Sequence, residues 1–198
     1  MINSFSKRFF LAFSMLAILF LSGCAVRYDN VKVDPVTKRT VITKMDAATA
    51  NEIASVTKRL MSLGPNIDPG EARMLAQEAV GYPRVLANQY KLVRPAYLQN
   101  ILVNYGYRDS GLCWQWTRDM AKHIQARQWK SFDFFHATAN RRRFNEHNSL
   151  VVTAKGKGVR DGMLIDPWRD SGKLFWEMTK DDPKYYWTRS PTNRCLDA

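Results

Sequence analysis

At its centre the chain reads Ser110-Gly111-Leu112-Cys113-Trp114-Gln115-Trp116. Ser110 is a suitable N-cap, and residues 112–127 contain neither proline nor glycine, so a helix is predicted from about Leu112 to Arg127. Cys113 would then lie in the first turn, among the unpaired N–H groups at the positive end of the helix dipole. That environment stabilises a thiolate, and the stretch therefore predicts Cys113 as a nucleophile.

A nucleophilic cysteine needs a general base, and the chain contains only three histidines. His123 lies on the same predicted helix as Cys113, about 15 Å further along, and cannot reach the thiol. His136 follows an aromatic cluster (residues 129–135) and is the alternative base. A structural role is the favoured interpretation of His136, because no carboxylate on a strand is predicted to partner it. His147 is the preferred base because of the sequence that follows it.

Two strands are predicted over residues 147–153 and 163–166. Glycine is preferred at the first central position of a type II′ turn, so Gly156-Lys157 is the predicted hairpin tip. Continued along both strands, this turn places His147 directly opposite Asp166. Directly opposed side chains share a face, with Cβ atoms about 4.5–5.5 Å apart. The pattern therefore predicts Asp166 as the partner of the His147 imidazole.

The same register gives the other face of the predicted hairpin a uniform apolar character. That face carries Leu150, Val152, Met163 and Ile165. A turn at Asp161-Gly162 is the alternative, and it would separate His147 from Asp166. The first register gives both faces consistent chemistry and is the one predicted.

Three motifs of the chain belong together: Gly111-Leu112-Cys113-Trp114, His147 at a strand start, and Leu164-Ile165-Asp166-Pro167-Trp168. They resemble the motifs of the transglutaminase-like branch of the papain-fold cysteine enzymes, and the resemblance extends over residues 95–190. It implies an α+β fold, with N-terminal helices and a nucleophile-bearing helix packed on a small antiparallel sheet. It also implies a Cys–His–Asp triad that performs acyl transfer or amide hydrolysis.

The roles in such a triad follow from chemical need. Cys113 attacks a carbonyl, His147 takes and returns a proton, and Asp166 fixes the imidazole. The backbone N–H of Cys113 would be one oxyanion donor. The second donor stays open, and Gln115 is a weak candidate because it points away from Cys113 along the helix. No metal or nucleotide cofactor is predicted, since no Cys/His pair has ligand spacing and no glycine-rich phosphate loop follows a strand.

The start of the chain predicts its location. Lys7 and Arg8 precede an apolar run, residues 9–21, which is short for a transmembrane helix. The run ends in Leu21-Ser22-Gly23-Cys24, which resembles the bacterial lipoprotein cleavage box; an ordinary signal peptide or a short membrane anchor is the alternative. Residues 1–23 are therefore predicted to be a signal peptide and Cys24 a lipidated N-terminus. In that family a residue such as Ala25 at the second position favours the periplasmic face of the outer membrane.

The remaining chain of about 175 residues is long enough for one domain with a substantial core. The formal net charge is +12 at pH 7, and about +10 without the signal peptide. Outside the inner membrane, anionic envelope polymers or lipid headgroups are more plausible partners than nucleic acid. Because the basic residues are scattered, solubility explains the charge equally well. Arg141-Arg142-Arg143 is the one dense run, and we predict a solvated loop there, with an anion site as the alternative.

The mature chain is predicted to begin with a tether and a short extended segment (24–45), followed by a single transglutaminase-like domain (46–198). The extended segment contains short strands at residues 31–33 and 40–42. Helices are predicted from an Asp46 cap to Leu63, from an Asp68 cap to Gly81-Tyr82-Pro83, and from about Pro95 to Tyr105. The third of these is expected to bury Leu98, Ile101 and Leu102.

Two functional classes follow. The first is an envelope-anchored cysteine enzyme that hydrolyses or transfers an amide or ester acyl group, for example of a peptide or a cell-wall amide. The alternative is a non-catalytic lipoprotein that uses the same fold as a binding or assembly module. A disulfide between Cys113 and Cys195 would favour that alternative in an oxidising compartment, but Cys195 lies in a polar tail and Cys113 is predicted to stay free. The sequence leaves open the substrate, the choice between hydrolase and transferase, and the oligomeric state.

Overall fold

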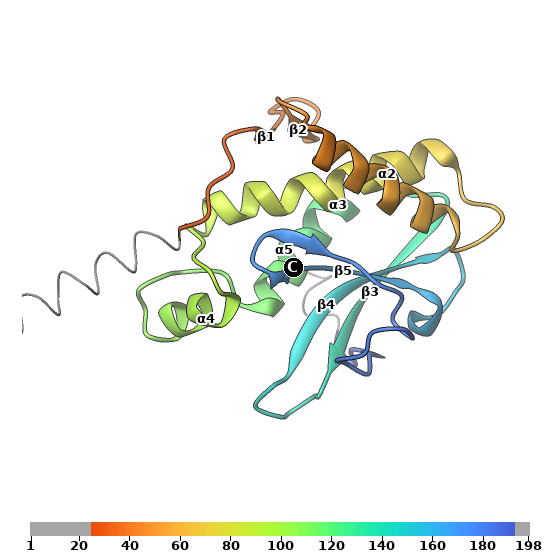
Figure 1. Cartoon of the computed structure of the whole chain (residues 1–198). Coiled ribbons are helices and arrows are strands. Elements are labelled where there is room, and N and C mark those ends of the chain that lie inside the picture. The colour runs from red at the N-terminus through yellow and green to blue at the C-terminus, as the bar shows by residue number, and fades with distance from the viewer. Residues whose placement is uncertain (1–24, 193–198) are drawn as a thin grey trace, which may run out of the picture.

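The computed structural model describes residues 25–192 (Figure 1). The helices of this part are α2 (Ala47–Met61), α3 (Pro69–Gln89), α4 (Ala96–Asn104) and α5 (Cys113–Gln125), with a short 3-10 turn, η1 (Val159–Asp161). The strands are β1 (Val31–Val33), β2 (Thr40–Ile42), β3 (Phe132–Ala139), β4 (His147–Ala154), β5 (Met163–Asp170), β6 (Lys173–Phe175) and β7 (Thr188–Arg189). The predicted α+β class is confirmed. The predicted signal peptide, Cys24 and Cys195 lie outside the described residues.

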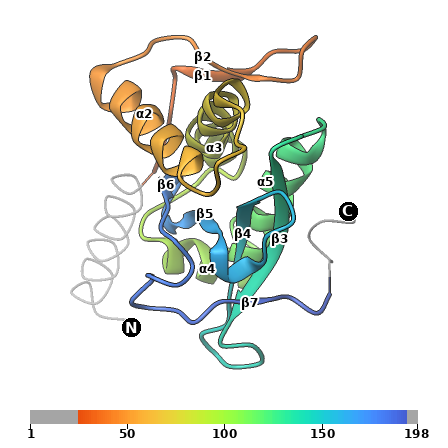
Figure 2. The same cartoon turned by 90° about the vertical axis from the view of Figure 1, so that its right-hand side faces the viewer.

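A five-stranded antiparallel sheet in the order β6-β5-β4-β3-β7 forms the middle of the molecule. Helix α5 packs on one face of β4 and β5, and α3 packs between α2 and the sheet near β6 (Figure 2). The other face of β4 and β5 is covered by irregular chain around Trp187, just before β7. The site described below lies at the start of β4, where His147 and the first residue of α5, Cys113, come together.

The amphipathic pattern of α5 fixes the helix on the sheet. Trp116, Met120 and Ile124 recur every four residues and are all buried against Leu150 and Val152 of β4. Burial of each such side chain contributes roughly 1.5–3 kcal/mol. The start of the helix is therefore held in a defined position relative to the sheet.

The predicted pairing of β4 with β5 was wrong by two residues. Leu150 pairs with Ile165, and Val152 with Met163. The connection is longer than a two-residue turn at Gly156-Lys157, because the chain first forms η1 and buries Val159 there. Side chains alternate with a period of two, so a two-residue shift leaves each one on its predicted face. The apolar set still packs under α5, and His147 becomes the diagonal neighbour of Asp166 instead of the direct one.

Helix α3 does not end at Gly81-Tyr82-Pro83 as predicted but continues through Pro83 to Gln89. A proline inside a helix costs roughly 3 kcal/mol. The turns around it bury Val80, Val85, Leu86 and Ala87, and burial of these side chains outweighs that cost. Tertiary packing therefore overrides the local stop signal.

The predicted helix starts were confirmed at both aspartate caps. Asp46 accepts a hydrogen bond from the Thr49 N–H at 2.7 Å, and Asp68 accepts one from the Glu71 N–H at 2.8 Å. Each bond satisfies one of the free N–H groups of a first turn. Local sequence alone was sufficient for these two boundaries.

Helix α4 was predicted at the correct place, but its predicted buried face was wrong. Its buried residues are Ala96 and Gln99, whereas Ile101 is 46% exposed. Gln99 turns inward because its amide binds three backbone groups, the N–H of Val93 and the carbonyls of Tyr90 and Ser110. Satisfying these buried groups outweighs the burial of one more apolar side chain.

The first described residues, Ala25 and Val26, already pair with the chain after α3. Ala25 forms a β-bridge with Val93, and the Val26 N–H donates to the Leu92 carbonyl at 2.8 Å. β1 and β2, both predicted, form an antiparallel pair that packs on α3. None of the helices in the described range is long and apolar enough to cross a membrane.

Candidate active site

Cys113 is the first residue of α5, as predicted, but the residue that precedes the helix is Leu112 and not Ser110. The cap is made by Gln115, whose Oε1 accepts hydrogen bonds from the N–H groups of Gly111 and Leu112, both at 2.9 Å. Gly111 has a φ of +129° and would place a Cβ 2.5 Å from Gln99, so only glycine fits there. The thiol is free and partly exposed.

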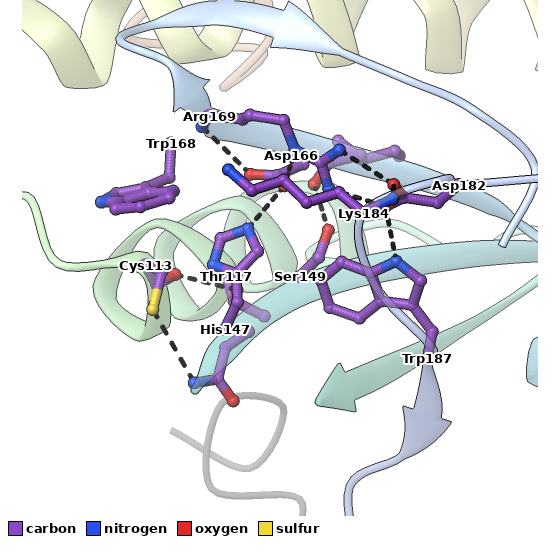
Figure 3. A network of polar contacts seen from close by, with 12 residues as sticks. Cys113, Thr117, His147, Ser149, Asp166, Trp168, Arg169, Asp182, Lys184 and Trp187 are labelled. Carbon is purple, nitrogen blue, oxygen red and sulfur yellow. Dashed lines mark hydrogen bonds and ion pairs between the residues drawn. The ribbon is translucent and has the colours of Figure 1, made fainter. Parts of the chain in front are cut away.

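The structure brings His147 and Asp166 into direct contact. His147 Nε2 lies 2.6 Å from Asp166 Oδ2, and both residues are only 1% exposed. In Figure 3 the His147 ring lies between Asp166 and Cys113, with one ring nitrogen joined to Asp166. The other nitrogen, Nδ1, is buried without a hydrogen-bond partner of ordinary geometry in residues 25–192.

The charge state of His147 is set by these neighbours. Burial by itself lowers the pKa of His147, but the ion pair and hydrogen bond with Asp166, with a further contribution from Cys113, raise it to about 9. At neutral pH His147 is therefore doubly protonated and positively charged. An imidazolium beside a thiol stabilises the thiolate.

Arg169 is a second partner of Asp166 that the sequence reasoning missed. Its Nε lies 3.2 Å from Asp166 Oδ2, and its other two nitrogens bind Asp182 at 3.2 and 2.8 Å. Asp182 also accepts hydrogen bonds from Trp187 Nε1 and the Lys184 N–H. Burial raises the pKa of Asp182, but these donors outweigh it and lower the pKa to about 2. Arg169 therefore bridges Asp166 and Asp182, and this network extends from the His147–Asp166 pair (Figure 3).

Aromatic rings enclose His147. Its ring centroid lies 4.6 Å from that of Trp168, 5.0 Å from that of Tyr185 and 5.4 Å from that of Trp187. Trp168 is held in turn by a hydrogen bond from Nε1 to Asn100 of α4. Rings in these positions keep water from the His147–Asp166 pair, which strengthens the electrostatic interaction between them.

Asn148 is a further residue beside the thiol that the sequence reasoning did not assign. Its Nδ2 lies 3.8 Å from Cys113 Sγ. Its Oδ1 accepts a hydrogen bond from the Thr138 hydroxyl at 3.1 Å and lies 2.7 Å from His136 Nε2. Because both of these partners lie on β3, the Asn148 oxygen faces β3 and its NH₂ group faces Cys113.

His136, the alternative base, helps to fix the orientation of the Asn148 amide. Its Nε2 contacts Asn148, and its Nδ1 lies 3.2 Å from the carbonyl oxygen of Thr192. Both ring nitrogens therefore have oxygen partners. The structural role is the one that the geometry supports.

His123, which was predicted to be too far from Cys113, belongs to a separate buried cluster. Its Nε2 lies 2.8 Å from Glu78 Oε2, and its ring stacks on Tyr82 with centroids 3.6 Å apart. Glu78 also accepts hydrogen bonds from the Thr40 N–H and from Arg127. The cluster joins β2, α3 and α5.

A cavity of about 740 Å³ opens beside Trp114 and Asn148, two neighbours of Cys113. Its lining comes from the start of α5, from β3 and β4, from the β3–β4 loop and from the chain after β7: Trp114, Arg118, His136, Thr138, Arg141, Arg142, Glu146, Asn148, Ser190 and Thr192. Asn148 belongs to this lining, and its Nδ2 lies 3.8 Å from Cys113 Sγ, so the cavity borders the cysteine.

Comparisons of the chain with family models, with curated proteins and with solved structures found no match. Among the described residues, no three His, Cys, Asp or Glu side chains are gathered in a way that could hold a metal ion. The geometry and chemistry of the site therefore carry the functional inference.

Proposed function

We propose that the chain is a cysteine enzyme that hydrolyses or transfers the acyl group of an amide or ester. The observation that carries the proposal is the alignment of Asp166, His147 and Cys113 from two strands and a helix start. One nitrogen of His147 is fixed by Asp166 at 2.6 Å, and the other is left for the thiol or the substrate. This is the arrangement that nucleophilic catalysis by cysteine requires.

In the first half of the reaction the Cys113 thiolate attacks the carbonyl carbon and forms a C–S bond. The carbonyl π electrons move to oxygen in the tetrahedral intermediate. When that intermediate collapses, the bond to the leaving nitrogen or oxygen breaks, and His147 gives its proton to the leaving group. The products of this half are the free amine or alcohol and a thioester on Cys113.

In the second half a water molecule or an acceptor amine attacks the thioester. His147, now neutral, takes the proton of the attacking group, and the C–S bond breaks to return the thiolate. Asp166 holds the imidazole orientation through both halves, and Arg169 keeps Asp166 in place. Water as the acceptor makes the enzyme a hydrolase, and an amine makes it a transferase.

The tetrahedral intermediate needs donors for its oxyanion, and two groups are suitably placed. The first is the backbone N–H of Cys113, which lies at the start of α5 with the positive end of the helix dipole. The second is Asn148 Nδ2, which lies 3.8 Å from the sulfur. An oxygen bound to the carbon attached to that sulfur can lie within hydrogen-bonding distance of Nδ2.

The proposed place of action is the bacterial cell envelope, with the protein anchored to the outer membrane through lipidated Cys24. The support is the charged, apolar and small-residue order of residues 1–24, which resembles a lipoprotein signal. A peptide or a cell-wall amide is then the substrate class in reach.

The test is to trap the acyl-enzyme. Full-length protein solubilised in detergent is mixed with a p-nitrophenyl ester, and release of nitrophenol is followed together with intact mass. A stoichiometric burst and an added acyl mass on the Cys113 peptide are expected.

Cys195→Ser is the matched control, because it removes the other cysteine that would carry no lipid in the proposed mature chain, and it should leave the burst unchanged. Cys113→Ser and His147→Gln should abolish it. Acylation that is no faster than that of the denatured protein, or that is unchanged in His147→Gln, would contradict an enzymatic role and favour a binding module.

A further inference from the structure

The β3–β4 loop places two arginines on the cavity beside the nucleophile. Arg141 and Arg142 both line it, whereas Arg143, the third member of the same run, does not. The prediction of a solvated loop holds in so far as all three residues are exposed. The position of the first two relative to Cys113 was not expected.

The loop is folded into a definite shape. The Arg143 N–H donates to the Asn140 carbonyl at 2.9 Å, and the Glu146 N–H donates to the Arg143 carbonyl at 3.0 Å. Arg142 adopts a left-handed backbone with a φ of +63°, and its N–H donates to Glu146 Oε2 at 2.6 Å. A non-glycine residue in this conformation is uncommon and is held here by that bond.

The charges around the cavity favour an anion. Arg118 is paired with Asp119 at 2.6 Å, so its charge is compensated locally. Arg141 and Arg142 form no ion pair with any residue of the described part. Glu146 brings one negative charge to the rim, and its carboxylate is engaged by the Arg142 backbone. Apart from Arg118, the cavity lining therefore carries two guanidinium groups and one carboxylate, an excess of positive charge.

The position of the cavity says which part of a substrate it would hold. Trp114 follows Cys113 in the chain and is 41% exposed, and Asn148 is the amide directed at the sulfur. Both line the cavity. A carbonyl under attack at Cys113 would thus lie where the cavity meets Asn148, and the groups next to that carbonyl would extend along the cavity that Arg141 and Arg142 also line.

We propose, resting on the proposed function, that the substrate carries a carboxylate close to the scissile carbonyl and that Arg141 and Arg142 bind it. A guanidinium group matches the two oxygens of a carboxylate and remains charged at every physiological pH. The preferred substrate is an anionic acyl compound, such as an amide of a dicarboxylic acid.

The experiment compares two alkylating reagents of nearly equal shape at Cys113. Iodoacetate carries a carboxylate and iodoacetamide does not, so the ratio of their rate constants reports on the charge near the thiol without needing turnover. Full-length protein with Cys195→Ser is used, and the modification is read by mass on the Cys113 peptide, which separates it from any reaction at Cys24. At low salt, Arg141→Gln with Arg142→Gln should lower the ratio about fivefold, with the iodoacetamide rate unchanged, and high salt should reduce this difference.

Arg143→Gln is the matched control, because it removes the same charge from the same loop outside the cavity and should leave the ratio unchanged. Replacing Arg141 and Arg142 by Lys keeps the charges and should restore most of the ratio. An unchanged ratio in the double Gln protein, or an equal loss in Arg143→Gln, would overturn the proposal. Loss of the iodoacetamide rate in the double Lys protein would also overturn it, because the loop would then act on the fold.

A second arm separates carboxylate from phosphate as the recognised anion. Glutarate should protect Cys113 from iodoacetamide in a manner that depends on Arg141 and Arg142, while inorganic phosphate at equal ionic strength should not. Protection by phosphate alone would overturn the assignment to a carboxylate. Because alkylation needs no acyl transfer, failure of this subsite and failure of the proposed function give different results.

Discussion

Replacing Asp166 by Asn should abolish a pH dependence of stability that the His147–Asp166 pair produces. Burial lowers the pKa of His147, but the ion pair and hydrogen bond with Asp166, together with Cys113, raise it from 6.5 to about 9. The folded state therefore holds this proton more tightly than the unfolded state. The stabilisation is fully present below pH 6.5 and is lost as the pH rises through 9. At about 1.4 kcal/mol per unit of pKa shift, the loss over this range is about 3 kcal/mol.

The assay is urea unfolding at intervals from about pH 6 to about pH 10. It is made in Cys113→Ser, which removes the other ionisable side chain beside His147 and leaves Asp166 as the group that raises its pKa. The free energy of unfolding should fall by up to about 3 kcal/mol as the pH rises in Cys113→Ser, and it should be nearly flat when Asp166→Asn is added.

Asp182→Asn is the matched control for the loss of a buried carboxylate. Asp182 binds Arg169 and Trp187 but not His147, so its replacement should lower stability at every pH and keep the slope. A slope that persists in Asp166→Asn would refute the reasoning. So would loss of the slope in Asp182→Asn alone.

Asn148→Ala should lower kcat about 10²–10³-fold in ester hydrolysis with little change in KM, since it removes one oxyanion donor; equal losses in binding and turnover would show another role. Glu78→Gln should lower the free energy of unfolding in urea by about 3 kcal/mol, because the partly buried Arg127 guanidinium loses its carboxylate partner. Cys24→Ser should abolish acylation and membrane fractionation, and an unmodified mature chain in the parent protein, seen by intact mass, would contradict the lipoprotein prediction. Thiol counting on denatured, non-reduced protein should find Cys113 and Cys195 both free, whereas a linked peptide would indicate a structural disulfide.

The parts of the fold that could be predicted are those decided by neighbouring residues. Asp46 and Asp68 each cap the third residue that follows, so the signal and its partner lie within one turn. The shared face of His147 and Asp166 is also a short-range property, because alternation along a strand needs only the parity of the register. His147 and Asp166 therefore share a face although the predicted turn between β4 and β5 was wrong.

The errors have a common physical origin in contacts between distant segments. Pro83 stays in a helix because side chains on the turns around it are buried by other elements. Gln99 faces inward because it bonds backbone groups on both sides of α4 in the chain. The β4–β5 connection is long because Val159 finds a buried position. None of these contacts has a signature within a window of a few residues.

The candidate site shows the same division. The order of cysteine, histidine and aspartate along the chain indicated the three residues, since each lies at the start or end of an expected element. Arg169 follows Asp166 by three residues and could have been noticed as a basic neighbour. Asn148 could not be assigned, because the direction of its amide depends on contacts of its oxygen with His136 and Thr138 of β3.

The attachment of the first described residues limits how far the proposed enzyme can act. With Cys24 as the lipidated residue, no residue lies between the anchor and the folded body, because Ala25 is already bridged to Val93. A domain of this size is roughly 40 Å across. An enzyme anchored in this way would reach only substrates that come within one domain diameter of the membrane surface.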